Sequence, residues 1–432
     1  MRILIIGAGG REHALAWRAA KSPRVAQVFV APGNAGTALE DKVRNVDVEA
    51  EDLTGLAEFA RSESIDLTIV GPEAPLVLGV VDAFEAAGLK CFGPRRDAAR
   101  LEGSKAYMKA FLARHSIPTA AYATFTRASF DESWVLAQRA PLVVKADGLA
   151  AGKGVVICQT PHEARDTALA MFAGRFGPAG DTVVIEEFLE GEEASFIAMV
   201  DGRHILPLAS SQDHKRRDDG DLGPNTGGMG AYSPAPVVTE TVHARVMREV
   251  MEPTVAGLAR EGSPYVGFLY AGLMIDGDGS PKVLEFNCRL GDPETQPIMA
   301  RLESDLTELC EAALAGRLDR CEARWDPRRA LGVVMAAEGY PNTVRKGDPI
   351  SGLDAAAALP GKVFHAGTRL ENGAVVTNGG RVLCAVGLGV DVASAQRTAY
   401  ALTDCIRWQG VQFRRDIGWR AVARERASDG SS

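Results

Sequence analysis

The sequence predicts an α/β protein with a parallel sheet at its N-terminal end. Two observations predict this class. Short apolar runs alternate with amphipathic stretches of helical spacing through the first part of the chain, and glycine- or proline-rich loops follow several of these runs. Strands that alternate with helices in this way form parallel sheets with helices on both faces. The length of 432 residues leaves room for several domains, at roughly 100–200 residues each.

Residues 1–102 form the predicted parallel-sheet domain, which is Rossmann-like in its alternation of elements. Ligands of such sheets bind beyond the carboxyl ends of the strands, so the loops 7–12, 31–36 and 71–75 are candidate binding loops. The expected strands are Arg2–Ile6, Gln27–Val30, Leu67–Val70 and Lys90–Phe92, and the expected helices are Glu12–Ala20, Leu53–Arg61 and Leu78–Ala87.

The pattern changes at Gly103, and residues 103–325 are expected to form a second domain. The polar, glycine-rich stretch 213–230 is too long for an ordinary connection and indicates a functional loop. A hairpin is expected around 276–279 (DGDG). The other expected elements are the helices Lys105–Arg114 and, approximately, Val242–Arg260, and the strands Leu142–Lys145, Gly154–Cys158, Thr182–Glu187, Ala194–Val200 and His204–Pro207.

A third domain of mixed α+β character is expected over residues 326–432. Its polar tail, Arg424–Ser432, is expected to be frayed. The expected strands are Ala330–Ala336, Lys362–His365, Ala374–Thr377 and Arg381–Leu388, followed by the helix Ser394–Ile406.

Charge and cysteine content exclude several classes of protein. The formal net charge of −8 argues against binding to nucleic acid or to anionic membranes, because both need a basic face. No apolar run reaches the roughly 18 residues of a membrane span, and the N-terminal run is too short for a signal peptide. Seven scattered cysteines without a CxxC pair indicate a reduced, cytoplasmic protein without a zinc site.

The first candidate binding loop contains GAGG at 7–10, between a predicted strand and a predicted helix. A dinucleotide fingerprint would have a third glycine where Glu12 stands and an acidic residue after the strand that ends at Val30. Both are missing, which disfavours a nicotinamide cofactor. The free amides of a helix N-terminus, together with Arg11, suit a phosphate group. A structural turn without a ligand is the alternative.

The second candidate is the glycine-rich segment 148–154, GLAAGKG. Its spacing is one residue shorter than that of a P-loop, and Gly154 stands where a magnesium-binding hydroxyl would be. Because strands flank it on both sides, it is expected to be a hairpin whose backbone amides close over phosphates, with an ammonium group from Lys145. A flexible hairpin without a ligand is the alternative.

Two acidic patterns follow. The strand 183–187 runs into the acidic turn 190–193, which suits an adenine ring and ribose hydroxyls, although acidic turns are also common on solvated surfaces. Glu285 and Asn287 are two residues apart on a strand and so share one face. Their oxygen atoms suit Mg²⁺ bound to phosphates. A polar edge strand is the alternative, but it does not explain the charged turn 289–296.

Taken together, these segments resemble the ATP-grasp superfamily and, within it, the phosphoribosylamine–glycine ligase family. The resemblance follows the order of the chain and covers nearly all of it. ATP-grasp elements alone indicate the superfamily, whereas the long literal runs indicate the family. The matching runs are 7–14 (GAGGREHA), 31–37 (APGNAGT), 70–76 (VGPEAPL), 145–154 (KADGLAAGKG), 211–216 (SQDHKR), 223–232 (GPNTGGMGAY), 285–294 (EFNCRLGDPE), 364–368 (FHAGT) and 376–383 (VTNGGRVL).

The resemblance implies an ATP-grasp fold, with an ATP-grasp domain over 103–325 that includes a small lid at about 123–190. It also implies a ligase of purine biosynthesis that uses ATP with Mg²⁺ or Mn²⁺. ATP would phosphorylate the carboxylate of glycine, and the amine of 5-phosphoribosylamine would then displace the phosphate to give glycinamide ribonucleotide. The implied partners are these small molecules, with no nucleic acid and no membrane, while protein partners stay open.

The resemblance also assigns roles to residues that match the family's motifs. Glu285 and Asn287 would hold the metal ion. Arg289 would neutralise charge on the transferred phosphoryl group, and Asp213 and Lys215 would bind the glycine ammonium and a nearby phosphate or carboxylate. The implied nucleotide-binding residues are Lys105, Lys145, Gly152, Lys153, Gly154, Glu186, Glu187, Phe188, Leu189 and Glu193. The implied substrate-binding residues are Gly10, Arg11, Asn34, Gly71, Glu73, Asp213, Arg289, Asp292 and Glu294.

One feature departs from the superfamily's pattern. Many ATP-grasp enzymes carry another acidic metal ligand on the earlier strand of the hairpin, whereas 271–274 (AGLM) holds no acid before Asp276. The number of metal ions and the full ligand set therefore stay open. A related ATP-grasp ligase with another carboxylate substrate is the alternative function. A nucleotide-binding module without catalysis is a third possible function. The presence of all the residues expected to bind phosphate and metal and to take part in catalysis argues against it.

Overall fold

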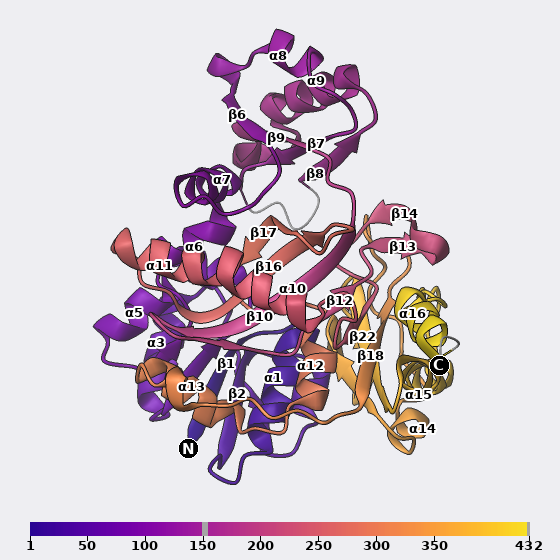
Figure 1. Ribbon diagram of the computed structural model, residues 1–432. Coiled ribbons are helices and arrows are strands. Elements are labelled where there is room, and N and C mark those ends of the chain that lie inside the picture. The colour runs from indigo at the N-terminus through magenta and orange to yellow at the C-terminus, as the bar shows by residue number, and fades with distance from the viewer. Residues whose placement is uncertain (149–153, 430–432) are drawn as a thin grey trace.

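The computed structural model describes residues 1–148 and 154–429, which form a body of several sheets with a separate lid above it (Figure 1). The N-terminal sheet is parallel, as predicted, with the order β3-β2-β1-β4-β5. Alternate residues of β1 enter different cores: Ile3 and Ile5 one, Leu4 and Ile6 the other, so both faces of the sheet are covered. The strands are β1 (Arg2–Gly7), β2 (Gln27–Pro32), β3 (Val43–Asn45), β4 (Leu67–Val70) and β5 (Cys91–Phe92).

The helices of this region place several candidate loops at one edge of the sheet. The predicted helix Leu78–Ala87 is present as α5 with slightly shorter limits, whereas the helix before it, α4, was not predicted; the two helices meet at Gly79, whose φ is 93°. Glycine adopts this conformation at little cost. The first helix begins at Glu73, directly after β4. The helices are α1 (Gly10–Ala20), α2 (Ala35–Ala38), α3 (Leu53–Ser62), α4 (Glu73–Leu78), α5 (Val80–Ala86) and α6 (Arg96–Gly103).

The central sheet is antiparallel, in the order β11-β10-β16-β17. Its strands are β10 (Glu192–Asp201), β11 (Ile205–Pro207), β16 (Val266–Ile275) and β17 (Pro281–Asn287). The helix expected near 242–260 is a continuous helical stretch with a wider turn at Met247–Met251. The helices of this region are α7 (Lys105–Arg114), α10 (Glu240–Val246), α11 (Glu252–Arg260), α12 (Thr295–Arg301) and α13 (Leu306–Leu314).

A β-bulge in β17 decides where its polar side chains point. Its pairing with β16 shifts register, so that Gly272 lies opposite Glu285 while the next residue, Leu273, lies opposite Val283. A bulge inserts one residue and reverses the alternation beyond it. Val283 and Phe286 are therefore both buried, and Glu285 and Asn287 share the opposite face.

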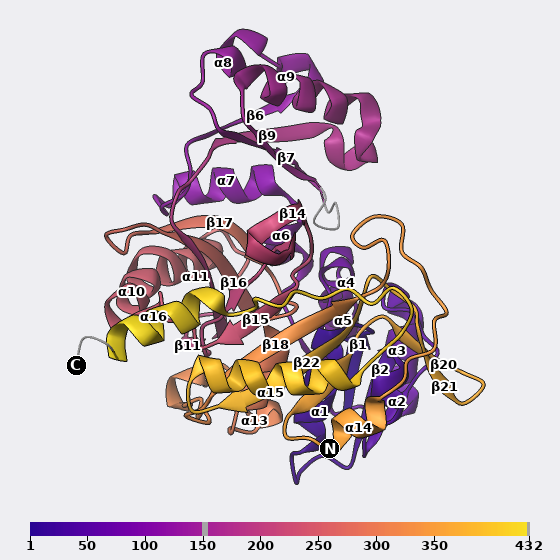
Figure 2. The same cartoon turned by 90° about the vertical axis from the view of Figure 1, so that its right-hand side faces the viewer.

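The lid has its own sheet, order β6-β9-β7-β8, and its own apolar core. It stands apart from the body in both views (Figure 2). Its strands are β6 (Tyr122–Thr126), β7 (Leu142–Ala146), β8 (Val155–Cys158) and β9 (Thr182–Glu187), and its helices include α8 (Glu132–Leu136) and α9 (Pro161–Ala170).

The C-terminal sheet, order β12-β15-β18-β22-β19, takes its first two strands from the two ends of the polar loop of the middle region. That loop also contains the hairpin β13 (Arg216–Asp218) and β14 (Leu222–Asn225). The sheet strands are β12 (Gln212–Asp213), β15 (Gly230–Ser233), β18 (Arg329–Ala336), β19 (Lys362–His365) and β22 (Arg381–Gly389). The remaining elements are β20 (Thr368–Glu371), β21 (Ala374–Thr377), α14 (Leu353–Ala357), α15 (Val392–Cys405) and α16 (Trp419–Asp429).

Most of the tail that was expected to be frayed is part of helix α16. Ala421 and Val422 pack into the C-terminal core, and Glu425 accepts a hydrogen bond from the amide of Val392, so the helix is held up to at least Glu425. All seven cysteines are free. Within the described residues, no helix combines the length and the apolar character that crossing a membrane requires.

Candidate active site

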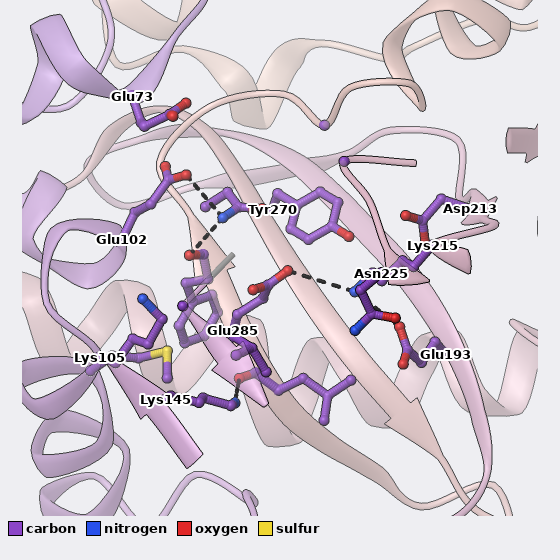
Figure 3. A pocket seen from close by; sticks show the side chains of 18 of the residues that line it. Glu73, Glu102, Lys105, Lys145, Glu193, Asp213, Lys215, Asn225, Tyr270 and Glu285 are labelled. Atoms are coloured by element: carbon purple, nitrogen blue, oxygen red, sulfur yellow. Dashed lines mark hydrogen bonds and ion pairs between the residues drawn. The ribbon is translucent and has the colours of Figure 1, made fainter. Parts of the chain in front are cut away.

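A cavity of about 560 Å³ lies where the lid, the central sheet and the N-terminal loops meet, and it gathers most of the predicted site residues (Figure 3). A volume of this size is typical of small-molecule sites. The predicted residues that line it are Arg11, Glu73, Lys105, Lys145, Gly154, Glu186, Glu187, Phe188, Leu189, Glu193, Asp213, Lys215, Glu285, Asn287, Arg289, Asp292 and Glu294.

The other predicted residues do not line this cavity or lie outside the described residues. The side chain of Asn34 caps α2 and donates to the carbonyl oxygens of Ala8 and His365 at 2.8 and 3.0 Å. Gly10 and Gly71 leave room for neighbouring side chains, since a Cβ atom there would meet Gln296 and Glu12, respectively. The residues outside the described ranges are Gly152 and Lys153.

A buried glutamate joins two lysines on the lid side. Glu186 on β9 is 2% exposed. Its Oε1 lies 2.7 Å from Nζ of Lys145 on β7, and its Oε2 lies 2.8 Å from Nζ of Lys109 on α7. Burial lowers the pKa of Lys109 to about 8, against the influence of Glu186. That Glu186 lines adenine stays a prediction; its carboxylate pairs with the two lysines.

Lys105 and a group of apolar residues complete the lid side. Nζ of Lys105 donates to the carbonyl oxygen of Gly148 at 3.1 Å, and burial lowers its pKa. Leu189 and Met274 belong to one apolar cluster, and Leu284 packs against this cluster. All three side chains line the cavity. Apolar contacts beside the exposed backbone of the 186–189 segment suit a planar base.

Acidic residues lie around Lys215, which lines the cavity (Figure 3). Its Nζ lies 2.9 Å from Oε2 of Glu193 and 3.8 Å from Oε1 of Glu285. Burial raises the pKa of Asp213 to about 8, although Lys215 lowers it. Burial alone would also raise the pKa of Glu285, but Lys215 and the neighbouring cations bring it below its ordinary value. Glu285 is therefore ionised, whereas Asp213 is close to a protonation change at neutral pH.

Arg289 links the end of β17 to the N-terminal region. Its Nε donates to Glu73 at 3.2 Å, and its Nη2 lies 2.8 Å from Oε1 of Glu102 on α6. Glu102 also accepts from the amide nitrogen of the Asn287 side chain at 3.0 Å. This contact uses the amide NH₂ group of Asn287 and turns its oxygen away from Glu102. Burial raises the pKa of Glu102, with Arg289 opposing.

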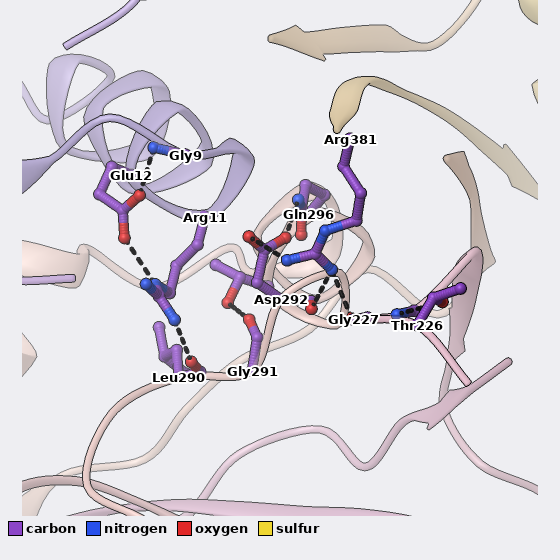
Figure 4. A network of polar contacts seen from close by, with 12 residues as sticks. Gly9, Arg11, Glu12, Thr226, Gly227, Leu290, Gly291, Asp292, Gln296 and Arg381 are labelled. Carbon is purple, nitrogen blue, oxygen red and sulfur yellow. Dashed lines mark hydrogen bonds and ion pairs between the residues drawn. The ribbon is translucent and has the colours of Figure 1, made fainter. Parts of the chain in front are cut away.

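Two more arginines, Arg11 and Arg381, line the cavity, and Figure 4 shows the polar network around them. Nε of Arg11 donates to Glu12 at 2.6 Å, and its Nη1 donates to the carbonyl oxygen of Leu290 at 3.1 Å. Arg381 at the start of β22 lies 3.1 Å from Oδ2 of Asp292. Glu12 also accepts from the amide of Gly9 at 2.5 Å, so part of the expected anion site at the N-terminus of α1 already has a partner.

Sequence reasoning missed several residues that shape the cavity. Lys109 lies four positions after Lys105 on one helix, a spacing that places both on the same face and could have revealed it. Arg381 lies within a run that was used for the family resemblance but was given no role. Ser195 donates to Glu294 at 2.8 Å and lies 2.9 Å from the Tyr270 hydroxyl. Like Glu102, these residues have no local motif.

The residues on β17 fit a hard divalent cation. The bulge puts the ionised carboxylate of Glu285 and the amide of Asn287 on one face, and both line the cavity. Oxygen donors are what Mg²⁺ and Mn²⁺ prefer. The described residues contain no cluster of three or more His, Cys, Asp or Glu side chains arranged for a metal ion. The protein therefore offers a partial ligand set, as is usual for Mg²⁺ bound together with substrate phosphates.

Comparisons with known proteins match this architecture. The family described as phosphoribosylglycinamide synthetase matches in three parts: the N domain at residues 1–102, the ATP-grasp (A) domain at 103–295 and the C domain at 330–420. Phosphoribosylamine–glycine ligase of Allochromatium vinosum is 68% identical over 99% of this chain and 100% of its own. That of Vibrio cholerae is 64% identical over the same shares.

Solved structures match as well. The crystal structure of phosphoribosylamine–glycine ligase from Thermotoga maritima has a TM-score of 0.83 at 35% identity and covers 96% of this chain and 100% of its own. A biotin carboxylase domain from Hydrogenobacter thermophilus has a TM-score of 0.72 at 16% identity, over 95% of this chain and 91% of its own, and shows the fold alone. Fold and cavity thus define an ATP-grasp enzyme. The chain belongs to the phosphoribosylamine–glycine ligase family, so the predicted fold and family are both confirmed.

Proposed function

We propose that the chain is an ATP-dependent ligase that joins glycine to 5-phosphoribosylamine and gives glycinamide ribonucleotide, ADP and phosphate in de novo purine biosynthesis. One observation carries the proposal: a single cavity brings together lysines from the lid side, oxygen ligands from β17 and arginines from the N- and C-terminal regions. The names of relatives at 62–68% identity support the same reaction.

In the first step, the γ-phosphoryl group of ATP passes to a carboxylate oxygen of glycine and ADP is released. Lys105 and Lys145 bind the nucleotide phosphates, and Glu186 and Lys109 hold Lys145 in place. The 186–189 segment binds adenine, and Glu193 is within reach of the ribose once Lys215 turns to the substrate. Positioning and charge neutralisation of this kind are the main protein contributions to phosphoryl transfer.

In the second step, the amine of 5-phosphoribosylamine attacks the carbonyl carbon of glycyl phosphate, forming the amide bond and releasing phosphate and a proton. Asp213 binds the glycine ammonium, and Lys215 and Arg289 bind oxygen atoms that gain negative charge. Arg11, Glu73, Asp292 and Glu294 face 5-phosphoribosylamine. A closed lid keeps water from the acyl phosphate.

Glu285 and Asn287 hold Mg²⁺ or Mn²⁺ in this proposal, and the ion supplies charge neutralisation on the phosphates. The domain limits 1–102, 103–325 and 326–432, and a cytoplasmic location, complete the proposal. Three regions that share one cavity and seven free cysteines agree with these assignments.

The test measures ADP release by the purified protein with ATP, Mg²⁺, glycine and freshly prepared 5-phosphoribosylamine. Release that requires both substrates and yields glycinamide ribonucleotide supports the proposal. Release that requires a different carboxylate supports a related ATP-grasp ligase instead. Tight ATP binding without turnover on any carboxylate contradicts an enzymatic role.

A further inference from the structure

The polar loop between β12 and β15 reaches the cavity from both of its ends. Asp213 and Lys215 line the cavity before the β13–β14 hairpin, and Asn225, Thr226 and Gly227 line it afterwards. The hairpin contributes almost no apolar packing of its own, because Leu222 is 66% exposed and all of β14 is exposed. Its position must therefore be fixed by polar contacts with another part of the chain.

Arg414, in the segment between α15 and α16, makes those contacts. Its side chain has an exposed fraction of 0%. Nη1 donates to the carbonyl oxygen of Arg216 at 3.1 Å and to Oδ1 of Asp221 at 2.8 Å. Nε and Nη2 donate to the carboxylate of Asp416 at 2.7 and 2.8 Å. One buried guanidinium thus joins the start of β13 and the turn before β14 to the C-terminal region. The hairpin itself lies beside α16 (Figure 1), whose Arg420 also donates to Asp221 at 2.8 Å.

Neighbouring residues hold both the tip and the base of the loop. At the tip, the amide of Arg415 donates to Asp219 and the amide of Gly220 donates to Asp416, each at 2.8 Å. At the base, the amide of Gly418 donates to Nε2 of His214 at 3.1 Å. His214 stands between Asp213 and Lys215 in the chain. The 414–418 segment therefore contacts the loop at a residue that lies between two cavity-lining residues.

We propose that Arg414 is a positioning residue that holds the β13–β14 hairpin so that Asp213 and Lys215 meet the amino-acid substrate. This inference rests on the proposed function, which assigns those two residues to glycine. Lys105, Lys145 and Glu186 come from α7, β7 and β9, which the Arg414 contacts do not involve. Weakening the Arg414 contacts should therefore affect the use of glycine and spare the binding of ATP.

The sharpest variant is Asp221→Asn. It weakens the contacts of Asp221 with Arg414 and with Arg420 while leaving Arg414 paired with Asp416, and Asn tolerates the positive φ of 56° found at Asp221. We expect KM for glycine to rise about tenfold, because a hydrogen bond between charged groups is lost and only part of its effect is transmitted to the cavity. The Kd for ATP, measured by calorimetry, should stay within about twofold of wild type.

Arg414→Lys is the second variant, and it should raise KM for glycine in the same direction while keeping the buried charge. Arg415→Gln is the matched control, because that neighbouring side chain is 58% exposed and pairs with Asp404 on the surface. An unchanged KM for glycine in both test variants overturns the inference alone, as does a parallel loss of ATP affinity. Wild-type protein that binds ATP but does not use glycine overturns the proposed function and this inference together.

Discussion

The two sides of the cavity carry different cations in different settings. On the lid side, Lys109 and Lys145 share the carboxylate of Glu186, and Lys105 donates to a carbonyl oxygen. On the opposite side each arginine has a carboxylate partner of its own. The pairs are Arg11 with Glu12, Arg289 with Glu73 and Glu102, and Arg381 with Asp292.

The difference indicates how each side meets its ligand. Lysine is a compact charge on a flexible stem, whereas arginine presents a planar fork of donors. The lid side keeps an excess of positive charge, which suits a triphosphate that supplies the missing negative charge. The arginines are oriented before any ligand arrives, which suits recognition of one small substrate in one orientation. The lid side is therefore expected to govern ATP affinity, and the arginine side to govern the second substrate.

Glu285→Gln tests the point where the two sides meet, and we expect the largest effect there. The neutral amide keeps the shape of the side chain but binds the metal ion less well. Turnover should therefore fall about 10³-fold, which is the order of effect seen when one strong electrostatic contact to the transition state is lost. Activity as a function of Mg²⁺ concentration and the thermal midpoint measure this. Asp278→Asn, at the exposed turn of the same hairpin, is the control. Normal turnover in Glu285→Gln would remove Glu285 from the metal site.

Arg11→Ala tests the arginine side. The variant loses a charged donor at the cavity, so KM for 5-phosphoribosylamine should rise about 10- to 100-fold, from roughly 1.5–3 kcal/mol per charged hydrogen bond. KM for ATP should change much less. Arg18→Ala, on the same helix but bonded to the carbonyl oxygen of Ser304, is the control. A selective loss of ATP affinity would mean that the two sides have been assigned to the wrong ligands.

Lys109→Met tests the lid side. Burial holds the pKa of Lys109 near 8, so this ammonium group loses its charge as the pH rises above about 8. Glu186 then pairs with Lys145 alone, so its negative charge offsets more of the positive charge that Lys145 offers to the phosphates.

We therefore expect KM for ATP in the wild type to rise with pH above that value, by up to about tenfold, the equivalent of one pKa unit. Lys109→Met should show the higher KM at every pH. Arg114→Gln, on the same helix and paired with Glu261, should keep the wild-type pH profile. A pH-independent KM in the wild type would contradict the shared-carboxylate interpretation.

Glu40 belongs to neither side of the cavity, so Glu40→Gln should affect stability more than catalysis. Glu40 contacts His13 on α1 and Lys362 on β19. Burial alone would raise its pKa, but the hydrogen bonds from His13 and Lys362 lower it to about 2. The native state thus gains stability from this carboxylate above about pH 4.5, up to roughly 3 kcal/mol, and loses it as the pH falls towards 2.

The variant should unfold at lower denaturant concentration than the wild type at pH 7, and the gap should close in acid. Glu63→Gln, at a surface pair with Arg2, is the control and should show a smaller gap. A gap that persists unchanged at low pH would exclude ionised Glu40 as its source.

Much of the fold was predictable because it is encoded locally. Apolar runs such as Leu67–Val70 are strands with the predicted limits, and Lys105–Arg114 is a helix with the predicted limits. The errors arose where a single backbone conformation or a distant contact decides. Helix α4 was not predicted, and Gly79, with its positive φ, separates it from the predicted helix. The β13–β14 hairpin was not predicted either, because it has no alternating apolar pattern and is held by Arg414 from a distant part of the chain.

The candidate site divides in the same way. Glu285, Asn287 and Arg289 lie in one run of sequence, so a motif could indicate them together. Glu102 reaches the cavity from α6 through contacts with Asn287 and Arg289 that no spacing rule predicts. The partner of Glu186 could not be predicted either, since Lys109 is far from it in sequence and meets it only when α7 packs against β9.

The bulge in β17 makes strand length as important as side-chain identity. If the pairing with β16 ran on from Val283 without the bulge, strict alternation would turn the two candidate ligands towards the hydrophobic interior and an apolar residue towards the substrates. Such a protein would retain every amino acid assigned to the metal and still be unable to bind it. Deletion of Leu284, the extra residue, should keep both ligands on the cavity face, whereas insertion of a further residue between Val283 and Glu285 should turn them away from it.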